Sequence, residues 1–197
     1  MMEIKNVKVY DLEESIKASS YPMSIGNTPE EVSFSDLMDC DFKRASKLGS
    51  VRSGSGHDNF LKGIVVNFDI SAPQYWWPQF QRYHFADIVS SQSKMHRLTK
   101  MDLDAQYNEW VLPEAKLIVK DLISEYDQNP SKDNFQRLVS NVPMGLNLSA
   151  RITTNYLQLK GIHSQRRSHK LNEWQYFCDW VETLPYFTDF VKAVGGK

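Results

Sequence analysis

The alternation of apolar and polar residues indicates that the chain contains both strands and helices. Residues 64–70 place apolar side chains at every second position, namely Ile64, Val66, Phe68 and Ile70. A period of two is typical of a half-buried strand. We expect Pro73 to end this strand and a short helix to begin close to it. Because Pro78 is tolerated only in the first turn of a helix, that helix should be short or kinked.

Three later segments have the period of an amphipathic helix. Residues 114–126 carry Leu117, Ile118, Leu122 and Tyr126 at helical spacing, opposite Glu114, Lys116, Lys120 and Glu125. A second helix is expected over residues 133–140, ending before Pro143. In residues 171–184 the apolar side chains form one stripe, namely Leu171, Trp174, Phe177, Cys178, Val181 and Leu184. We interpret that stripe as core packing. These patterns predict an α+β or an α/β protein.

Length, charge and cysteine usage narrow the class of protein. A chain of 197 residues predicts a single domain. Its 23 Lys and Arg residues nearly balance 24 Asp and Glu residues, so the overall charge does not favour nucleic-acid or membrane binding. No run of 18 apolar residues and no apolar leader is present, and we expect a cytoplasmic protein. Cys40 and Cys178 have no metal-ligand spacing, so we expect reduced thiols and no metal site.

Two segments are expected to be flexible, and three blocks carry residues suited to a ligand site. The flexible segments are the Gly- and Ser-rich residues 47–56 and the turn-forming residues 126–134. The first block, residues 55–70, reads "SGHDNFLKGIVVNFDI", and the second, residues 77–84, reads "WPQFQRYH". The third, residues 142–177, reads "VPMGLNLSARITTNYLQLKGIHSQRRSHKLNEWQYF".

In this order, the three blocks resemble the flavin-dependent thymidylate synthases. Gly56 and His57 match the family's Gly-His-x-Ser-x-Leu-Glu-His block, from which Lys62 and Gly63 depart. The second block is similar to the family's Gln-x-x-Arg-His-Arg motif. Gln79 and Arg82 match it, whereas Tyr83 and His84 replace the final His-Arg pair. In the third block the matching residues fall at the family's spacing, namely Pro143, Thr153, Asn155, Arg166, Ser168, His169 and Glu173.

The resemblance implies a fold, an assembly and a reaction. The fold would be α+β, with a twisted, mainly antiparallel sheet flanked by helices, formed by one domain over residues 1–197. Residues 1–50 match nothing in the family and would be an N-terminal elaboration. The protein would be a homotetramer that binds FAD and dUMP where subunits meet. The family's reaction transfers a methylene group from methylenetetrahydrofolate to C5 of dUMP, with reduced flavin supplying the hydride and NADPH reducing the flavin. It uses no cysteine nucleophile.

The resemblance assigns Arg166 to catalysis and to binding of the uracil ring. Electrons added at C5 or C6 place negative charge on the carbonyl oxygens of the ring, and a fixed guanidinium stabilises that charge. The structural alternative is a solvated arginine, since "HSQRRSHK" (residues 163–170) is a basic cluster at the end of a predicted helix, where cations are favoured.

The resemblance also assigns residues to the nucleotide and to the flavin. Gln79 and Arg82 share a helical face and would hold the nucleotide, with Arg82 close to both ligands. His57, His84 and Asn155 would contact the flavin. Each has a structural alternative: an exposed ion pair for Gln79 and Arg82, a plain loop residue for His57 and a helix N-cap for Asn155.

A Ser-rich segment is the expected phosphate site. Direct counting from Arg82 places Ser90, Gln92 and Lys94 at the family's dUMP-binding Glu, Ser and Arg positions. A shift of two residues places Gln92, Lys94 and His96 there instead. Both registers, together with Ser93, keep neutral donors and a cation that an anion can use. Neither register keeps the glutamate, and Val139 replaces a family arginine, although Arg137 is nearby.

The aromatic residues Tyr75, Trp76 and Trp77 could stack on a flavin or pterin ring. The structural alternative is that they are core or subunit contacts.

The leading hypothesis for the function is a divergent flavin-dependent enzyme that transfers a one-carbon unit to dUMP or a related pyrimidine nucleotide. The second is a non-catalytic homologue that binds nucleotides or proteins, and the third is an unrelated α+β scaffold protein.

Overall fold

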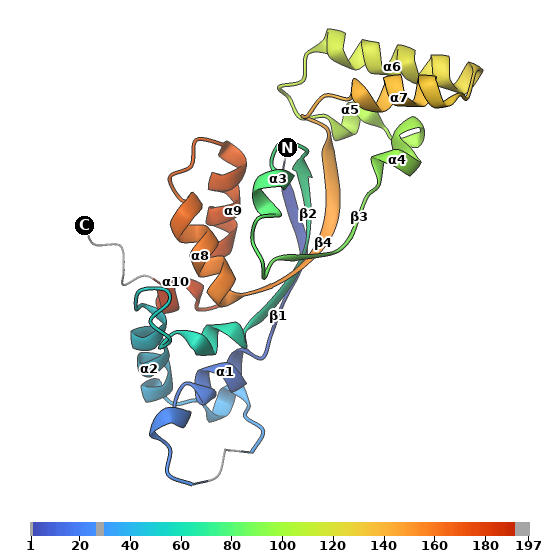
Figure 1. Ribbon diagram of the computed structural model, residues 1–197. Coiled ribbons are helices and arrows are strands. Elements are labelled where there is room, and N and C mark those ends of the chain that lie inside the picture. The colour runs from blue at the N-terminus through green and yellow to red at the C-terminus, as the bar shows by residue number, and fades with distance from the viewer. Residues whose placement is uncertain (1, 27–29, 192–197) are drawn as a thin grey trace. The chain divides into compact units, whose positions relative to one another are not determined.

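A computed structural model of the chain describes residues 2–26 and 30–191. Within these ranges four strands form one antiparallel sheet in the order β1-β2-β4-β3 (Figure 1). The strands are β1 (Glu3–Tyr10), β2 (Val65–Pro73), β3 (Asp87–Ser91) and β4 (Asn147–Asn155). Helices accompany the sheet, so the fold is α+β with a mainly antiparallel sheet, and the predicted fold class is confirmed.

Strand β2 has the alternation that the sequence predicts. Val66, Phe68 and Ile70 are almost completely buried, and the residues between them are only partly buried. The strand ends at Pro73 as expected. One face of β2 therefore packs into the core, while its other face carries polar side chains such as Asp69 and Ser71 that line a hollow described below.

The chain divides into two compact units. Unit 1 consists of residues 1–6, 68–84 and 88–152. Unit 2 consists of residues 7–67, 85–87 and 153–197. All four strands contribute residues to both units. The expectation of one domain over residues 1–197 stays a prediction.

Unit 1 contains short helices after β2 and β3 and one long helical hairpin before β4. Its helices are α3 (Trp77–Phe80), α4 (Lys94–Arg97), the 3-10 turn η4 (Leu98–Lys100), α5 (Leu103–Gln106), α6 (Pro113–Gln128) and α7 (Lys132–Ser140). Helices α6 and α7 pack side by side and are both predicted by the sequence (Figure 1). Helix α7 begins where the Ser131 hydroxyl accepts a hydrogen bond from the backbone N–H of Asn134 at 3.2 Å.

The predicted apolar face of α6 is partly wrong. Leu117 and Ile118 are 59% and 54% exposed, whereas the buried residues of the helix are Val119 and Leu122. The residues that pack into the hydrophobic cluster of unit 1 recur at helical spacing, as Val119, Leu122, Ile123 and Tyr126. The sequence contains two overlapping apolar stripes on this helix, and packing against α7 selects the second.

Unit 2 consists mainly of helices. Its elements are α1 (Leu12–Ala18), the 3-10 turns η1 (Tyr21–Met23) and η2 (Phe34–Asp36), α2 (Asp39–Gly49), the 3-10 turn η3 (Asn59–Lys62), α8 (Tyr156–Arg166), α9 (Asn172–Glu182) and α10 (Phe187–Val191). Helix α10 packs so closely on α2 that a Cβ at Gly49 would lie 2.5 Å from the carbonyl oxygen of Phe190. On α9 the predicted core stripe is confirmed, because Trp174, Phe177, Cys178 and Val181 are fully buried.

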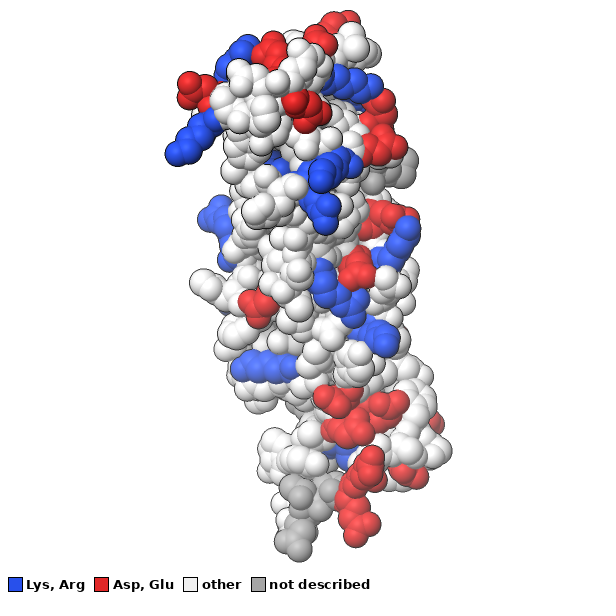
Figure 2. Space-filling view, turned by 90° about the vertical axis from the view of Figure 1, so that its right-hand side faces the viewer, with Lys and Arg blue, Asp and Glu red and all other residues white. Residues whose placement is uncertain are grey.

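The predicted flexible segments are partly helical. Residues 47–49 close α2 and residues 126–128 close α6, so turns and loops begin only after these positions. Among the described residues no helix combines the length and the apolar character needed to cross a membrane. The face drawn in Figure 2 carries side chains of both charges, and Asp and Glu side chains gather at its lower end.

Candidate functional site

The predicted site residues after β2 stand on a short helix that aromatic packing fixes in place. Helix α3 has only four residues and carries Pro78 in its first turn, as predicted. Trp76 stacks on Phe80 with ring centroids 4.7 Å apart, and both are fully buried. The indole N–H of Trp77 donates to the carbonyl oxygen of Ala72 at 3.0 Å. Trp76 is therefore a core residue, which was the structural alternative to stacking on a ligand. Helix α3 is a rigid support for the residues that follow it.

Gln79, Arg82 and His84 lie on and just after this support. Gln79 is half-buried on α3, and Arg82 and His84 are exposed in the turns that precede β3. Arg82 forms no ion pair with any described residue, so its guanidinium is available to an external anion. The structural alternative of an exposed ion pair does not apply to Arg82 within the described chain.

The Ser-rich segment leads from β3 into α4, where hydrogen bonds fix Gln92. The backbone N–H of Gln92 donates to the carbonyl oxygen of Ser149 at 2.8 Å. Its side-chain Oε1 accepts from the backbone N–H of Ser149 at 3.0 Å and from Nε2 of Gln106 at 3.3 Å. Because Oε1 is held by two donors, the Nε2 group of Gln92 has no partner among the described residues.

Three hollows in unit 1 meet at this segment, and Ser91 and Gln92 line all three. The sheet hollow, of about 420 Å³, is lined by Glu3, Lys5, Asp69, Ile70, Ser71, Ser90, Ser91, Gln92, Ser149, Ala150 and Arg151. The α4 hollow, of about 640 Å³, is lined by Ser91, Gln92, Ser93, His96, Arg97, Lys100, Met101, Asp102 and Gln106. The α3 hollow, of about 280 Å³, is lined by Gln74, Trp77, Pro78, Gln81, Ile88, Ser91, Gln92, Met144, Leu148 and Ser149.

These hollows bring some of the predicted nucleotide residues together but not all of them. Ser90 lines the sheet hollow, and Gln92 and Ser93 line the α4 hollow. Lys94 lines none of the three, because its Nζ donates to Oε1 of Gln74 at 2.9 Å. Gln79, Arg82 and His84 also lie outside them.

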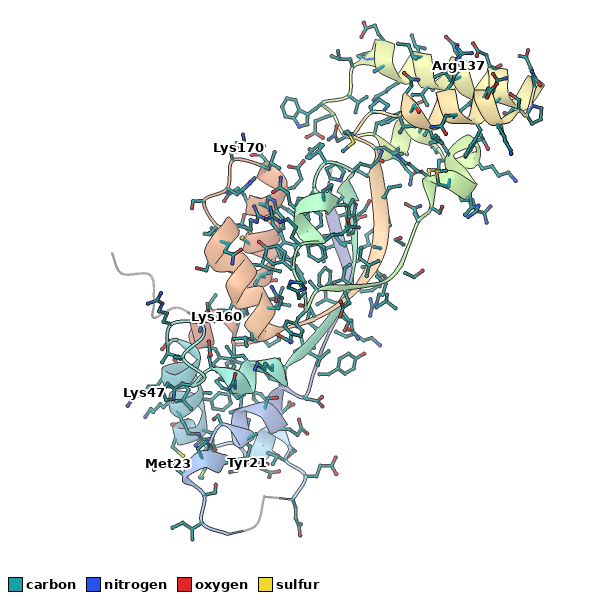
Figure 3. The ribbon with its side chains drawn as sticks, in the orientation of Figure 1. Tyr21, Met23, Lys47, Arg137, Lys160 and Lys170 are labelled. Carbon is teal, nitrogen blue, oxygen red and sulfur yellow. The ribbon has the colours of Figure 1, made fainter. Side chains whose placement is uncertain are left out.

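Sequence reasoning assigned no role to Arg97 or Lys100, and it considered His96 only in the shifted register. The signal was present as the basic run "KMHRLTK" at residues 94–100. Arg137 stands near the position of the missing family arginine and pairs with Glu125 at 2.8 Å on the exposed side of α7 (Figure 3).

In unit 2, Asn155 is the N-cap of α8. Its side-chain oxygen accepts the backbone N–H of Gln158 at 2.9 Å, which confirms the capping role. The amide nitrogen of the side chain has no partner among the described residues and can still donate to a ligand. Both uses considered for this residue are therefore compatible.

His57 is exposed in the loop between α2 and η3. This loop is anchored by Lys160 of α8, which is buried next to it (Figure 3). Nζ of Lys160 donates to the carbonyl oxygens of Gly49 and Val51 at 2.8 and 2.6 Å and to Asp58 beside His57. No sequence pattern indicates this anchor, since a lysine in a helix is normally solvated.

Arg166 is the last residue of α8, and its guanidinium lies over the ring of Trp174, 4.7 Å from the ring centroid. A stacked guanidinium has fewer accessible orientations than a solvated one. His169 is nearby, and burial together with the charges of Arg166 and Lys170 lowers its pKa. The lowered pKa favours the neutral form of this imidazole beside the Arg166 guanidinium.

Neither thiol is set up as a nucleophile or as a metal ligand. Burial raises the pKa of the Cys178 thiol to about 11, so it stays protonated near neutral pH. Cys40 is exposed on unit 2, at the start of α2. Within residues 2–26 and 30–191, no group of three or more His, Cys, Asp or Glu side chains is arranged to hold a metal ion.

Comparison with known proteins identifies the fold. Neither a protein-family model nor a curated protein sequence matches the chain. Flavin-dependent thymidylate synthase ThyX from Helicobacter pylori, complexed with FAD and dUMP, has a TM-score of 0.70 at 16% identity, covering 96% of each chain. A second structure of that enzyme with FAD and dUMP has a TM-score of 0.66 at 17% identity, covering 100% of each chain.

A third similar structure is a UMP/dUMP methylase, PolB from Streptomyces cacaoi, bound with 5-Br dUMP. It has a TM-score of 0.64 at 14% identity and covers 98% of this chain and 92% of its own. Because the likeness extends over nearly the whole of every chain, it includes residues 1–50, for which the sequence showed no match.

Proposed function

We propose that this chain, which has the fold of the flavin-dependent thymidylate synthases, binds a pyrimidine nucleoside monophosphate and methylates its base. The substrate would be dUMP or the related UMP, and the one-carbon donor would be methylenetetrahydrofolate. FAD would be the bound cofactor and NADPH the reductant. The predicted homotetramer and cytoplasmic location belong to the same proposal.

The observation that carries the proposal is the likeness over the whole chain to structures that hold dUMP or a brominated dUMP. It is supported by the position of the predicted phosphate segment. Of the residues that the resemblance assigns to the phosphate, Ser90, Gln92 and Ser93 line hollows, whereas Lys94 does not. Gln92, with Oε1 held by two donors, keeps an amide N–H₂ group without a partner among the described residues.

The donors present also fit a flavin nucleotide. Phosphate and ring oxygens are acceptors, and they are bound by guanidinium, imidazole and amide donors. Arg82, His84 and His57 are exposed, and Asn155 keeps a side-chain N–H₂ group after capping α8. We assign these four residues to FAD. The bound cofactor would supply the hydride for the methyl group.

Arg166 would act on the base. Adding electrons to the pyrimidine at C5 or C6 increases negative charge on its carbonyl oxygens, and a preorganised cation lowers the free energy of that state. Stacking on Trp174 restrains the guanidinium before substrate arrives. Because Cys178 is a buried thiol with a pKa of about 11, we assign no covalent step to a cysteine.

Three measurements on the purified protein test the proposal. The visible spectrum, with and without added FAD, reports flavin binding, and calorimetric titration reports binding of dUMP and UMP. Tritium release from dUMP labelled at C5, in the presence of methylenetetrahydrofolate and NADPH, reports methylation. We expect flavin absorption, nucleotide binding and tritium release. A protein that binds neither FAD nor a nucleotide would exclude the proposed enzyme.

A second candidate is a nucleotide-binding homologue without catalytic activity. It is favoured by the ion pair of Arg137 with Glu125, which leaves the missing family arginine without a replacement at that place. It is also favoured by Ser90, which stands at the direct-register position of the family's glutamate. The same measurements separate the two functions, since this candidate would bind dUMP but release no tritium.

A further inference from the structure

The loop between α2 and η3 in unit 2 has few interactions of its own. Its residues 52–57 are all exposed, so none of their side chains is packed in the core. Among the described residues, the one backbone hydrogen bond that this segment donates runs from the N–H of Ser55 to the carbonyl oxygen of Arg52 at 3.2 Å. Gly54 and Gly56 have φ values of 89° and 82°, a region that glycine enters at little cost. Such a segment stays ordered only if its ends are held.

Lys160 of α8 holds this loop at both ends (Figure 3). On one side its Nζ donates to the carbonyl oxygens of Gly49 and Val51 at 2.8 and 2.6 Å. On the other side it donates to the carboxylate of Asp58 at 2.6 Å. An ammonium group has three N–H bonds, and these three acceptors use all of them. The lysine therefore acts on the loop and has no N–H bond left for a ligand.

His57 is the side chain that this anchor places. It is exposed, and it directly precedes Asp58, so its backbone lies one peptide bond from a residue with a fixed carboxylate. On its other side Gly56 turns the chain in the left-handed region. The imidazole is therefore presented to solvent from a restrained backbone. A donor that is in place before its ligand arrives loses less conformational freedom on binding, and the ligand binds more tightly.

We infer that Lys160 is a positioning residue for the flavin, because it fixes the loop from which His57 would contact the cofactor. This inference rests on the proposed function, in which His57 is assigned to FAD. It gives the buried ion pair of Lys160 and Asp58 a role beyond the stability of the fold. A lysine that only stabilised the fold would leave the flavin affinity of the folded protein unchanged.

The test is a double-mutant cycle on flavin affinity, measured with the full chain. Wild type, Lys160→Met, His57→Ala and the variant that combines both substitutions are titrated with FAD, and the change in flavin fluorescence gives each Kd. Val181→Ala is the control for stability, because it removes buried apolar atoms from α9, a helix outside the loop and its anchor. Circular dichroism verifies that every variant is folded at the temperature of the titration.

The loss of one hydrogen bond to a phosphate is expected to weaken binding about tenfold, so we expect this loss for His57→Ala. Lys160→Met should also weaken FAD binding by about tenfold, because the imidazole is no longer held in place. The combined variant should lose about tenfold and not about a hundredfold, since both substitutions act on the same contact. Val181→Ala should bind FAD as wild type does.

A further variant keeps the test decisive if Lys160→Met does not fold. The variant Lys160→Met, Asp58→Leu removes both charges and should be more stable than Lys160→Met alone. It still lacks the hydrogen bonds to Gly49 and Val51, so it should bind FAD about tenfold more weakly than wild type. Hydrogen exchange of the backbone amides of residues 52–57 should also be faster in it than in wild type. A purely structural role predicts instead that flavin affinity recovers together with stability.

The outcomes separate this inference from the proposed function. If wild type binds FAD and Lys160→Met binds it as tightly, Lys160 does not position the flavin site and the proposed function stands. The same conclusion follows if the losses of Lys160→Met and His57→Ala multiply in the combined variant, because the lysine would then act on something other than His57. If wild type does not bind FAD, the proposed function and this role are both overturned.

Discussion

Lys160 and Asp58 form a buried ion pair in unit 2, with Nζ 2.6 Å from Oδ2 and side chains only 6% and 2% exposed. Together with the carbonyl oxygens of Gly49 and Val51, the carboxylate satisfies all three N–H bonds of the ammonium group. One side chain of α8 thus fixes both ends of the loop that carries His57. The loop is Gly- and Ser-rich, so its order depends on this anchor.

Replacing Lys160 by Met should destabilise the protein by about 3–5 kcal/mol. The substitution leaves the Asp58 carboxylate buried without a counter-charge, and the carbonyl oxygens of Gly49 and Val51 lose their donor. Urea denaturation followed by circular dichroism measures the free energy of unfolding. The control is Lys170→Met, which removes an exposed lysine from the same unit and should change the free energy by less than about 0.5 kcal/mol.

The double variant Lys160→Met, Asp58→Leu distinguishes charge from packing. It removes both charges, so it should recover part of the stability lost by the single variant. Recovery should be incomplete, because Gly49 and Val51 still lack a donor. Equal stability of Lys160→Met and wild type would show that the pair is not buried in solution.

Asp41 of α2 predicts how the stability of unit 2 changes at acid pH. Burial alone would raise the pKa of its carboxyl group, but the backbone N–H of Met38 and the guanidinium of Arg44 outweigh burial and lower it. A carboxylate whose pKa is lower in the folded state stabilises that state above the unfolded pKa. The stabilisation is lost as pH falls through the folded pKa.

We therefore expect Asp41→Asn to reduce stability at neutral pH and to weaken its dependence on pH below about 4. Thermal unfolding between pH 3 and pH 7, in steps of about half a unit, measures both effects. Asp39→Asn is the control, because Asp39 is exposed in the same helix turn. If the unfolding temperature of Asp41→Asn fell with decreasing pH as steeply as that of wild type, the role of Asp41 would be contradicted.

Local periodicity was sufficient to predict the elements that have only one apolar stripe. Strand β2 and helix α9 each offer a single stripe, and each buries it. Helix α6 offers two, and the choice between Leu117 and Val119 depends on α7, a partner that local sequence does not specify. A buried charged residue cannot be predicted from its neighbours in sequence either, because the carboxylate that pairs with Lys160 lies 102 residues away along the chain.

In the candidate site, the sequence predicts local structure best for residues that match a family motif at the family's spacing. Asn155 precedes a helix at the family's spacing, and it caps that helix. The phosphate segment was less predictable, because the direction of a side chain after a strand depends on hydrogen bonds to a neighbouring strand. Ser149 of β4 fixes Gln92 in this way, and Gln74 binds Lys94.

The two cysteines should react at very different rates with a thiol reagent. Burial raises the pKa of Cys178 to about 11, and its side chain is inaccessible, whereas Cys40 is exposed. Titration of the native protein with Ellman's reagent should therefore give one fast equivalent, and titration in guanidinium chloride should give two. Cys40→Ser should remove the fast equivalent. Two fast equivalents in the native wild type would show that α9 opens readily.

Arg166→Ala separates the proposed chemistry from the stability of the fold. Removing a cation that stabilises developing charge should lower turnover about 10²–10³-fold in the tritium-release assay. The lost contact with Trp174 should cost only about 0.5–2 kcal/mol of stability, so the variant should stay folded. Arg167→Ala is the control, because that neighbouring arginine pairs with Asp179 and Glu182 on the exposed side. Unchanged turnover in Arg166→Ala, or an equal loss in Arg167→Ala, would exclude Arg166 from the reaction.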